Sequence, residues 1–136
     1  MRFAVLVKAN EQSEAGVMPT AEQLDEMGKF NEELIRDGVM LAADGLLASS
    51  KGVRIRFSGG KTTVVDGPFA ETKELVSGFW IVQAKSRDEV VERMKRAPFG
   101  HDAEIEIRQI MEADDFGADM TDKVRAQEER LHAIQH

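Results

Sequence analysis

Apolar and polar side chains alternate along several short segments of the chain, which is the pattern of β-strands with one buried face. Strands are predicted over residues 2–8, 53–57, 62–65 and 103–111, and also over the more continuously apolar segments 76–84 and 39–47, the latter with an interruption near Asp44-Gly45. Between 53–57 and 62–65 lies Ser58-Gly59-Gly60-Lys61. Paired glycines tolerate the positive φ angles of tight turns, so this part of the sequence predicts a β-hairpin.

Apolar residues recur at helical spacing in two parts of the chain. Thr20, with Gln23 three positions later, has the pattern of a capping box and predicts a helix that continues to about Arg36 and stops at Asp37-Gly38. Its apolar stripe is predicted to contain Leu24, Met27, Phe30 or Asn31, Leu34 and Ile35. A second helix is expected from Ser86 or Asp88 to about Arg96, with Val90, Val91 and Met94 inward. Residues 9–19 are predicted to be a loop.

The predicted order is strand–helix–strand, a hairpin, then strand–helix–strand. This order favours an α+β fold, a ferredoxin-like βαββαβ sandwich with an inserted β-hairpin. Both faces of 76–84 are apolar, with Trp80 on one face and Phe79 and Ile81 on the other. Because two helices cover only one face of a sheet, the second face needs another cover. We therefore expect a homodimer that buries the face carrying Leu6, Phe79, Ile81 and Glu106.

The C-terminal segment differs from the rest in its polarity. Residues 1–112 are expected to form the α+β domain, and residues 113–136 a tail that is helical. Met120, Val124, Leu131 and Ile134 recur there at helical spacing and would share one face.

Composition narrows the class of protein. The chain has 136 residues, which suits one domain, and its formal net charge of −7 argues against nucleic acid as a partner. It contains no cysteine, so disulfides, thiol nucleophiles and thiolate metal sites are excluded. No apolar run is long enough to span a membrane, and the N-terminus does not resemble a signal peptide. We expect a cytoplasmic protein with no membrane association, no cofactor and no metal site.

The most specific short segment is Asp66-Gly67-Pro68-Phe69, followed by Ala70-Glu71-Thr72-Lys73-Glu74. With the Met1–Val7 opening, Phe30–Leu34 and Glu104–Arg108, it resembles the YCII-related family, and within it the branch named for the Asp-Gly-Pro-Phe motif. The resemblance covers residues 1–112 and implies a dimeric α+β barrel, in which two ferredoxin-like sheets lie face to face.

The family's function is largely unestablished, and the resemblance implies only candidate roles. An enzymatic role has been suggested for YCII-type relatives from a His in the first helix and an Asp lining a pocket. Here residues 20–37 contain no His, and the histidines are His101, His132 and His136, so that pair is not carried over. Genes of the Asp-Gly-Pro-Phe branch often neighbour those of alternative sigma factors, which implies a regulatory protein partner.

The candidate ligand-binding residues lie in or next to the motif and are Asp66, Gly67, Pro68, Phe69, Glu71 and Lys73. The first interpretation of Asp66 is a turn-forming residue whose carboxylate accepts hydrogen bonds from backbone N–H groups. The second is a pocket carboxylate that acts as a base or anchors a ligand. Glu71 and Lys73 are read as a solvated loop, or as a buried cluster that binds an anion or moves a proton. Glu106 and Arg108 are expected to form an ion pair in the dimer interface, with the polar floor of a pocket as the alternative.

Two functions remain in competition at this level. The first is a small dimeric protein that binds a small molecule or acts as an accessory or regulatory module. The second is an enzyme that performs acid–base chemistry on a small molecule with the carboxylates of Asp66 and Glu71. A pocket that reaches Asp66 would favour the enzyme, and a solvent-facing Asp66 would favour the module.

Overall fold

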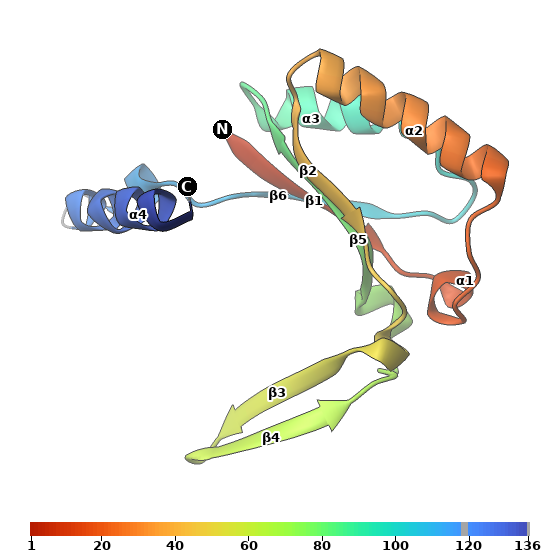
Figure 1. The fold of residues 1–136 in the computed structure, drawn as a ribbon, viewed down its shortest axis with the longest axis horizontal. Coiled ribbons are helices and arrows are strands. Elements are labelled where there is room, and N and C mark those ends of the chain that lie inside the picture. The colour runs from red at the N-terminus through yellow and green to blue at the C-terminus, as the bar shows by residue number, and fades with distance from the viewer. Residues whose placement is uncertain (118–119, 136) are drawn as a thin grey trace.

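The computed structural model describes residues 1–117 and 120–135 and has the predicted α+β architecture (Figure 1). Its strands are β1 (Arg2–Lys8), β2 (Met40–Gly45), β3 (Val53–Ser58), β4 (Lys61–Asp66), β5 (Val76–Gln83) and β6 (Ile105–Gln109). Its α-helices are α1 (Glu11–Glu14), α2 (Ala21–Arg36), α3 (Arg87–Met94) and α4 (Thr121–Gln135). The described residues also form the 3₁₀ turns η1 (Ser49–Lys51), η2 (Thr72–Glu74) and η3 (Ala113–Phe116).

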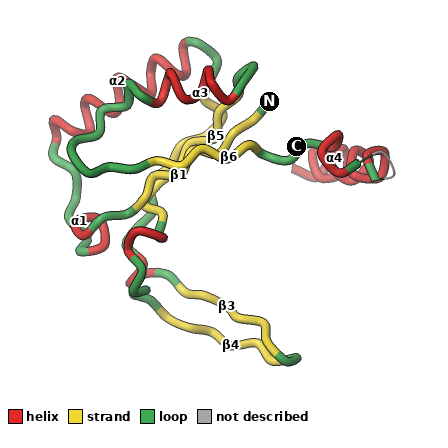
Figure 2. The backbone as a smooth tube through the Cα atoms, turned by 180° about the vertical axis from the view of Figure 1, so that it is seen from behind, coloured by secondary structure: helices red, strands yellow, loops and turns green. Residues whose placement is uncertain are grey.

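The main sheet has the strand order β2-β5-β1-β6, and the pairs are antiparallel. With the hairpin set aside, this is the strand order of a ferredoxin-like sandwich, so the predicted fold class is confirmed. Helices α2 and α3 lie on the same face of the sheet, as Figures 1 and 2 both show. No described helix covers the opposite face, which we call the open face. In this single chain the sheet is open rather than closed into a barrel.

The hydrophobic core lies between the sheet and the two helices. Phe3 and Val5 of β1 and Val82 of β5 are fully buried, and Leu34 of α2 packs against them. Trp80 anchors this layer, because its indole N–H donates a 2.8 Å hydrogen bond to the Asn31 side chain. Its ring also meets Phe30 and Phe99 edge-on, at centroid distances of 6.0 and 6.1 Å.

The helix boundaries largely follow the capping signals. Thr20 and Gln23 form the predicted capping box of α2, and Ser86 is the N-cap of α3. The predicted apolar stripe of α2 is partly wrong, because Leu24 and Ile35 are 60% and 61% exposed. Successive helical residues are rotated by about 100°, so a helix that buries Phe30 and Leu34 turns Ile35 away from the sheet.

The predicted loop over residues 9–19 also needs correction, because it contains the short helix α1. Asn10 caps this helix by accepting a hydrogen bond from the Ser13 N–H, and the Ser13 hydroxyl accepts one from the Asn10 N–H. Ser13 here performs the role that Glu or Gln has in the usual capping box, so the sequence signal was weaker.

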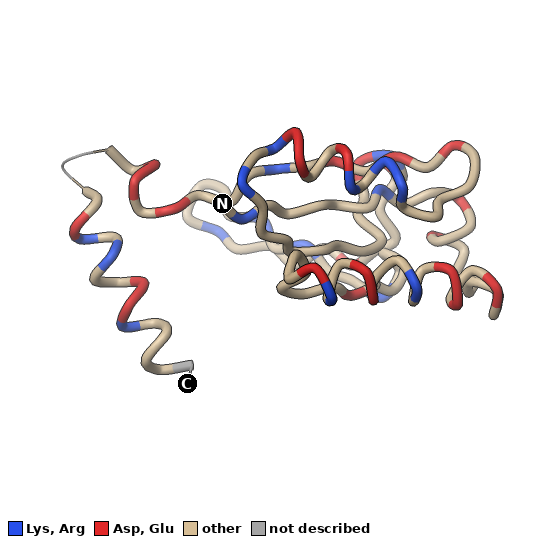
Figure 3. Tube along the Cα trace, turned by 90° about the horizontal axis from the view of Figure 1, so that it is seen from above, with Lys and Arg blue, Asp and Glu red and all other residues tan. Residues whose placement is uncertain are grey.

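Two elements extend from the sandwich. The β3–β4 hairpin turns at Gly59 and Gly60, whose φ angles are 57° and 77°, as the Gly-Gly pair predicts. The C-terminal helix α4 follows η3 and carries both acidic and basic residues along its length (Figure 3). His136 lies outside the described residues.

Candidate functional site

The Asp66–Glu74 segment joins the end of the hairpin to β5 and packs against the loop after β2. Gly67 and Phe69 are half-buried, whereas Asp66, Pro68, Glu71 and Lys73 are exposed. The structure therefore brings the six candidate residues into one short segment but places four of them at the surface. Among the six, Gly67 and Phe69 contact the loop that follows β2.

Gly67 lies against the backbone of Ser49. A Cβ atom at Gly67 would stand 1.8 Å from the Ser49 carbonyl oxygen, far inside van der Waals contact. The Gly67 N–H also donates a 3.0 Å hydrogen bond to the Gly52 carbonyl, and the Gly67–Pro68 peptide bond is cis. Glycine is thus required here because two backbone segments touch.

A polar network ties three distant segments together beside Gly67. The Ser49 hydroxyl and the Ser49 N–H both donate to the Glu14 carboxylate, the latter at 2.8 Å. The Phe69 N–H donates to the Ser49 hydroxyl oxygen at 3.0 Å. The hydroxyl bond, followed by the backbone bond, lowers the pKa of Glu14 below its ordinary value, with a smaller opposing effect of desolvation. We call Glu14, Ser49, Gly67 and Phe69 the junction.

The Phe69 ring is covered on one face by a cation. The Arg54 guanidinium of β3 lies 3.8 Å from the ring centroid, which is a cation–π contact. Phe69 therefore connects the hairpin to the junction through its ring and its N–H. The side-chain hydroxyl of Ser49 is occupied on both sides by Glu14 and Phe69, so it serves the fold rather than acting as a free nucleophile.

The surroundings of the charged candidates correct the first interpretation of Asp66 and agree with the solvated loop predicted for Glu71 and Lys73. Within the described residues no hydrogen bond reaches the Asp66 carboxylate, so Asp66 is not the predicted Asx-turn residue; its backbone instead pairs with Val53 at the end of β4. Lys73 is exposed in η2 and is not enclosed between Glu71 and Glu74. The reason in both cases is that the segment runs along the outside of the domain.

The open face carries the apolar residues expected there. Leu6 lies between Phe79 on β5 and Glu106 on β6 in the strand register, and Ala4 lies between Ile81 and Arg108. Leu6, Phe79, Ile81 and Glu106 are half-buried in the single chain. This face is therefore an apolar strip with a charged border.

The charged border of the open face consists of Glu106 and the two cations that pair with it. The Glu106 carboxylate pairs with Arg108 of the same strand at 3.3 Å and with Lys8 of β1 at 3.4 Å. The hydrogen bonds from Arg108 and then Lys8 lower the pKa of Glu106. The two cations leave Glu106 compensated, so the border could lie against another surface without burying a lone charge.

A surface hollow of about 280 Å³ lies elsewhere, at the end of the sheet near Asp37, Gly38, Gln83 and Arg93. Arg93 donates a 2.9 Å hydrogen bond to Asp37 there, which lowers the pKa of that carboxyl. The hollow is shallow, and its Asp37 and Arg93 side chains are paired with each other. It does not include any residue of the Asp66–Glu74 segment.

The two described histidines, His101 and His132, lie apart from the junction. His101 is exposed in the loop between α3 and β6, and His132 lies on α4. Among residues 1–117 and 120–135, no group of three His, Asp or Glu side chains is arranged to hold a metal ion. No helix in the same ranges is long and apolar enough to cross a membrane.

Sequence reasoning missed three residues of this region, namely Glu14, Ser49 and Arg54. Glu14 and Ser49 are 35 positions apart, and nothing local indicates that they meet. Arg54 is one of two arginines in an alternating strand, and only the path of the chain after Asp66 brings Phe69 beneath it. The Asp-Gly-Pro-Phe motif itself was the only usable signal.

Comparison with known proteins places the chain in a family. The YCII-related domain matches residues 1–114. An uncharacterised protein of Rhizobium meliloti (strain 1021), R00369, is 30% identical over 95 residues, which cover 68% of this chain and 76% of that protein. A solved structure, the 5-chloro-2-hydroxyhydroquinone dehydrochlorinase TftG from Burkholderia phenoliruptrix AC1100 in complex with 2,5-dihydroxybenzoquinone, aligns with a TM-score of 0.43. It is 15% identical, and the alignment covers 82% of this chain and 95% of TftG.

Gly67→Ala should destabilise the protein by roughly 1–3 kcal/mol or more, because its Cβ meets backbone atoms that cannot rotate away. The matched control is Gly100→Ala, where an added Cβ has open space and the backbone does not have a positive φ. That control should change stability by less than about 1 kcal/mol. Chemical denaturation of both variants measures the difference, and equal stabilities would contradict the close approach at Gly67.

Glu14 should make stability depend on pH in the acid range. Its pKa is lowered in the folded chain, so its contribution is complete above the ordinary value of 4.5 and disappears as the pH falls through the lowered value. Glu14→Gln should therefore be less stable than the wild type at neutral pH, and the two should converge on acidification. Urea denaturation over this range tests the prediction, with Glu11→Gln on the same helix as the control for charge loss. A difference between Glu14→Gln and the wild type that does not change with pH would contradict it.

Proposed function

The protein belongs to the YCII-related family, and we propose that it works as a homodimeric binding module rather than as an acid–base enzyme. The observation that supports this most directly is the open face. An apolar sheet surface without a helical cover is unusual in a monomer, and a second copy supplies a cover with identical chemistry. In the proposed dimer the two open faces lie against each other.

The composition of the open face supports a protein interface. Its centre is apolar, and its charged border is already compensated, because Glu106 has both Lys8 and Arg108 as partners. Removing this border from water therefore leaves no lone carboxylate. An apolar centre with a polar rim is the usual composition of a stable interface.

The ligand-binding segment in this proposal is the one predicted from the motif, residues 66–74. Phe69 offers an aromatic wall, and Asp66, Glu71 and Lys73 offer polar groups of both signs at the surface. The segment lies at the base of the hairpin, beside the end of the sheet, so a partner subunit on the open face would lie next to it. We propose a small-molecule ligand, with a regulatory protein partner as the alternative occupant.

Catalysis is the weaker alternative. A carboxylate that acts as a base near neutral pH needs burial or a neighbouring negative charge. Asp66 and Glu71 are both exposed, and no histidine of the described residues lies beside them. The solvent-facing Asp66 favours the binding module over the enzyme.

Phe79→Asp should convert the protein from a dimer to a monomer, because it places a lone charge in the centre of the proposed interface. Ile35→Asp is the matched control, since Ile35 is exposed on α2, on the other side of the sheet. Sedimentation at micromolar concentration should give a dimer mass for the wild type and for Ile35→Asp. A monomer mass for the wild type would exclude the homodimer.

A small-molecule screen followed by chemical-shift mapping should perturb residues 66–74. Phe69→Ala should weaken the same ligand, because it removes the aromatic wall while leaving the charged groups. Ile35→Ala, an exposed substitution on α2, serves as the control. Shifts confined to other parts of the chain, such as the hollow at Asp37 and Arg93, would contradict the assignment of this segment.

A further inference from the structure

Besides the open face, two apolar surfaces outside the core lack a cover in the described chain. The first is the α4 stripe, formed by Met120, Val124, Leu131 and Ile134; Leu131 is 59% and Ile134 82% exposed. The second is the hairpin face, formed by Val53, Ile55, Phe57 and Val64, which are 53–80% exposed. Ile55 pairs directly with Val64 across the hairpin, so these side chains share one face.

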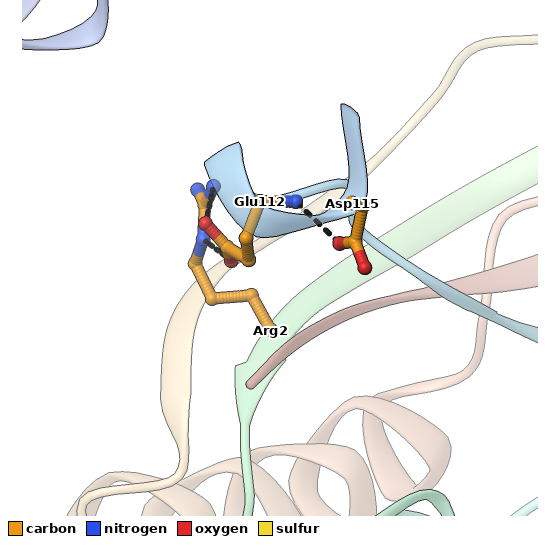
Figure 4. A network of polar contacts seen from close by, with 3 residues as sticks. All are labelled: Arg2, Glu112 and Asp115. Atoms are coloured by element: carbon orange, nitrogen blue, oxygen red, sulfur yellow. Dashed lines mark hydrogen bonds and ion pairs between the residues drawn. The ribbon is translucent and has the colours of Figure 1, made fainter. Parts of the chain in front are cut away.

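The two surfaces stand at opposite ends of the sheet. The segment leading to α4 is fixed at the start of β1, where the Arg2 guanidinium donates a 2.9 Å hydrogen bond to Glu112 and the Glu112 N–H donates to Asp115 (Figure 4). Arg125 pairs with Asp114 and holds α4 to η3. The hairpin instead departs near the other end of β1, because β2 ends and β5 begins there.

Both elements project to the side of the open face, away from α2 and α3 (Figures 1 and 2). Strand β1 separates their roots by its seven residues, or about 23 Å, and the two elements stand apart in both views. A two-fold axis parallel to the sheet and perpendicular to β1 exchanges the two ends of the sheet. In a dimer built on such an axis, the α4 of each subunit comes beside the hairpin of its partner.

Net charge favours contact between the hairpin and the C-terminal segment over contact between two hairpins or between two C-terminal segments. Residues 51–66 contain four basic and one acidic side chain, for a net charge of +3. Residues 112–135 contain seven acidic and three basic side chains, for a net charge of −4. Hairpin against hairpin, or tail against tail, would bring like charges together, whereas hairpin against tail brings opposite charges together.

The size of the open face gives an independent reason for further contacts. Four strands of five to eight residues outline about 400 Å² of sheet. A standard interface buries roughly 800 Å² on each partner. The side chains that project from the sheet make its accessible area larger than this outline. Contacts outside the sheet would nevertheless bring the buried area closer to that of a standard interface.

We propose that the α4 stripe of each subunit docks on the hairpin face of the partner and so clamps the dimer. This inference rests on the homodimer proposed above and adds its specific contacts. The helix lies beyond residues 1–114, which match the family domain. The clamp is therefore a feature of this chain's own C-terminal segment.

The absence of cysteine from the sequence allows a direct cross-linking test, because any disulfide must join introduced residues. Full-length chains carrying Phe57→Cys are mixed with a mass-tagged population carrying Leu131→Cys, allowed to exchange subunits, and oxidised. The expected product is a disulfide-linked dimer of mixed mass. In the matched control Glu129→Cys replaces Leu131→Cys, because Glu129 lies on the opposite side of α4, and it should link at least about tenfold less.

Dimer affinity provides a second, independent measurement. Leu131→Asp combined with Ile134→Asp should weaken the dimer about tenfold or more, as expected when apolar anchors are lost. Ala126→Asp combined with Ala133→Asp adds the same charge to the other side of the same helix and should have a smaller effect. Both double variants keep the full chain, so folding can be verified by circular dichroism before affinity is measured.

The outcomes separate the clamp from the dimer itself. A wild-type monomer in sedimentation would overturn both proposals. A stable dimer in which Leu131→Cys links no better than Glu129→Cys, or links only to another Leu131→Cys chain, would overturn the clamp and leave the homodimer intact. Equal dimer affinities for the two double variants would also overturn the clamp alone.

Discussion

Packing of α2 and α3 against one face of the four-stranded sheet is the interaction on which the other features depend. Trp80 is central to it, because its indole N–H is satisfied by Asn31 while its ring contacts Phe30 and Phe99. Burial of this layer uses one face of each strand of the main sheet, together with α2 and α3. The opposite face is left apolar and open, and the proposed assembly follows from that one-sided cover.

The junction is the second structural requirement, because the hairpin is inserted between β2 and β5 and has no place in the main sheet. Its orientation is set where it leaves the domain, by the close contact of Gly67 with Ser49 and by the network from Glu14 to Phe69. The Asp-Gly-Pro-Phe motif therefore has a clear mechanical role. Its glycine and phenylalanine hold the hairpin, while its aspartate remains exposed to solvent.

These two features connect fold to proposed function. A hairpin held firmly at its base can present its apolar face to a partner, and a compensated charge border lets the open face approach a second copy. The segment proposed to bind a ligand, residues 66–74, lies between the hairpin and the open face. Binding at that position would depend on the dimer, since the single chain leaves most of the segment exposed.

The sequence by itself determined the elements whose signals are local. Several elements could be predicted because each depends on residues within a few positions of one another. They are the capping box of Thr20 and Gln23, the Ser86 cap, the Gly59-Gly60 turn and strand β5, which is apolar on both faces. The order of these elements then fixed the ferredoxin-like topology, since few connections are compatible with it. The motif also indicated the region of the chain in which Gly67 and Phe69 make their contacts with Ser49.

Only the tertiary structure decided which of these residues make contacts. Nothing near Glu14 indicates that it accepts hydrogen bonds from Ser49, and the need for glycine at position 67 comes from a backbone that passes by from another element. Leu24 and Ile35 matched a helical pattern, yet the direction in which α2 faces the sheet leaves them exposed. Contacts between residues far apart in sequence depend on the path of the whole chain, which periodicity and turn chemistry do not encode.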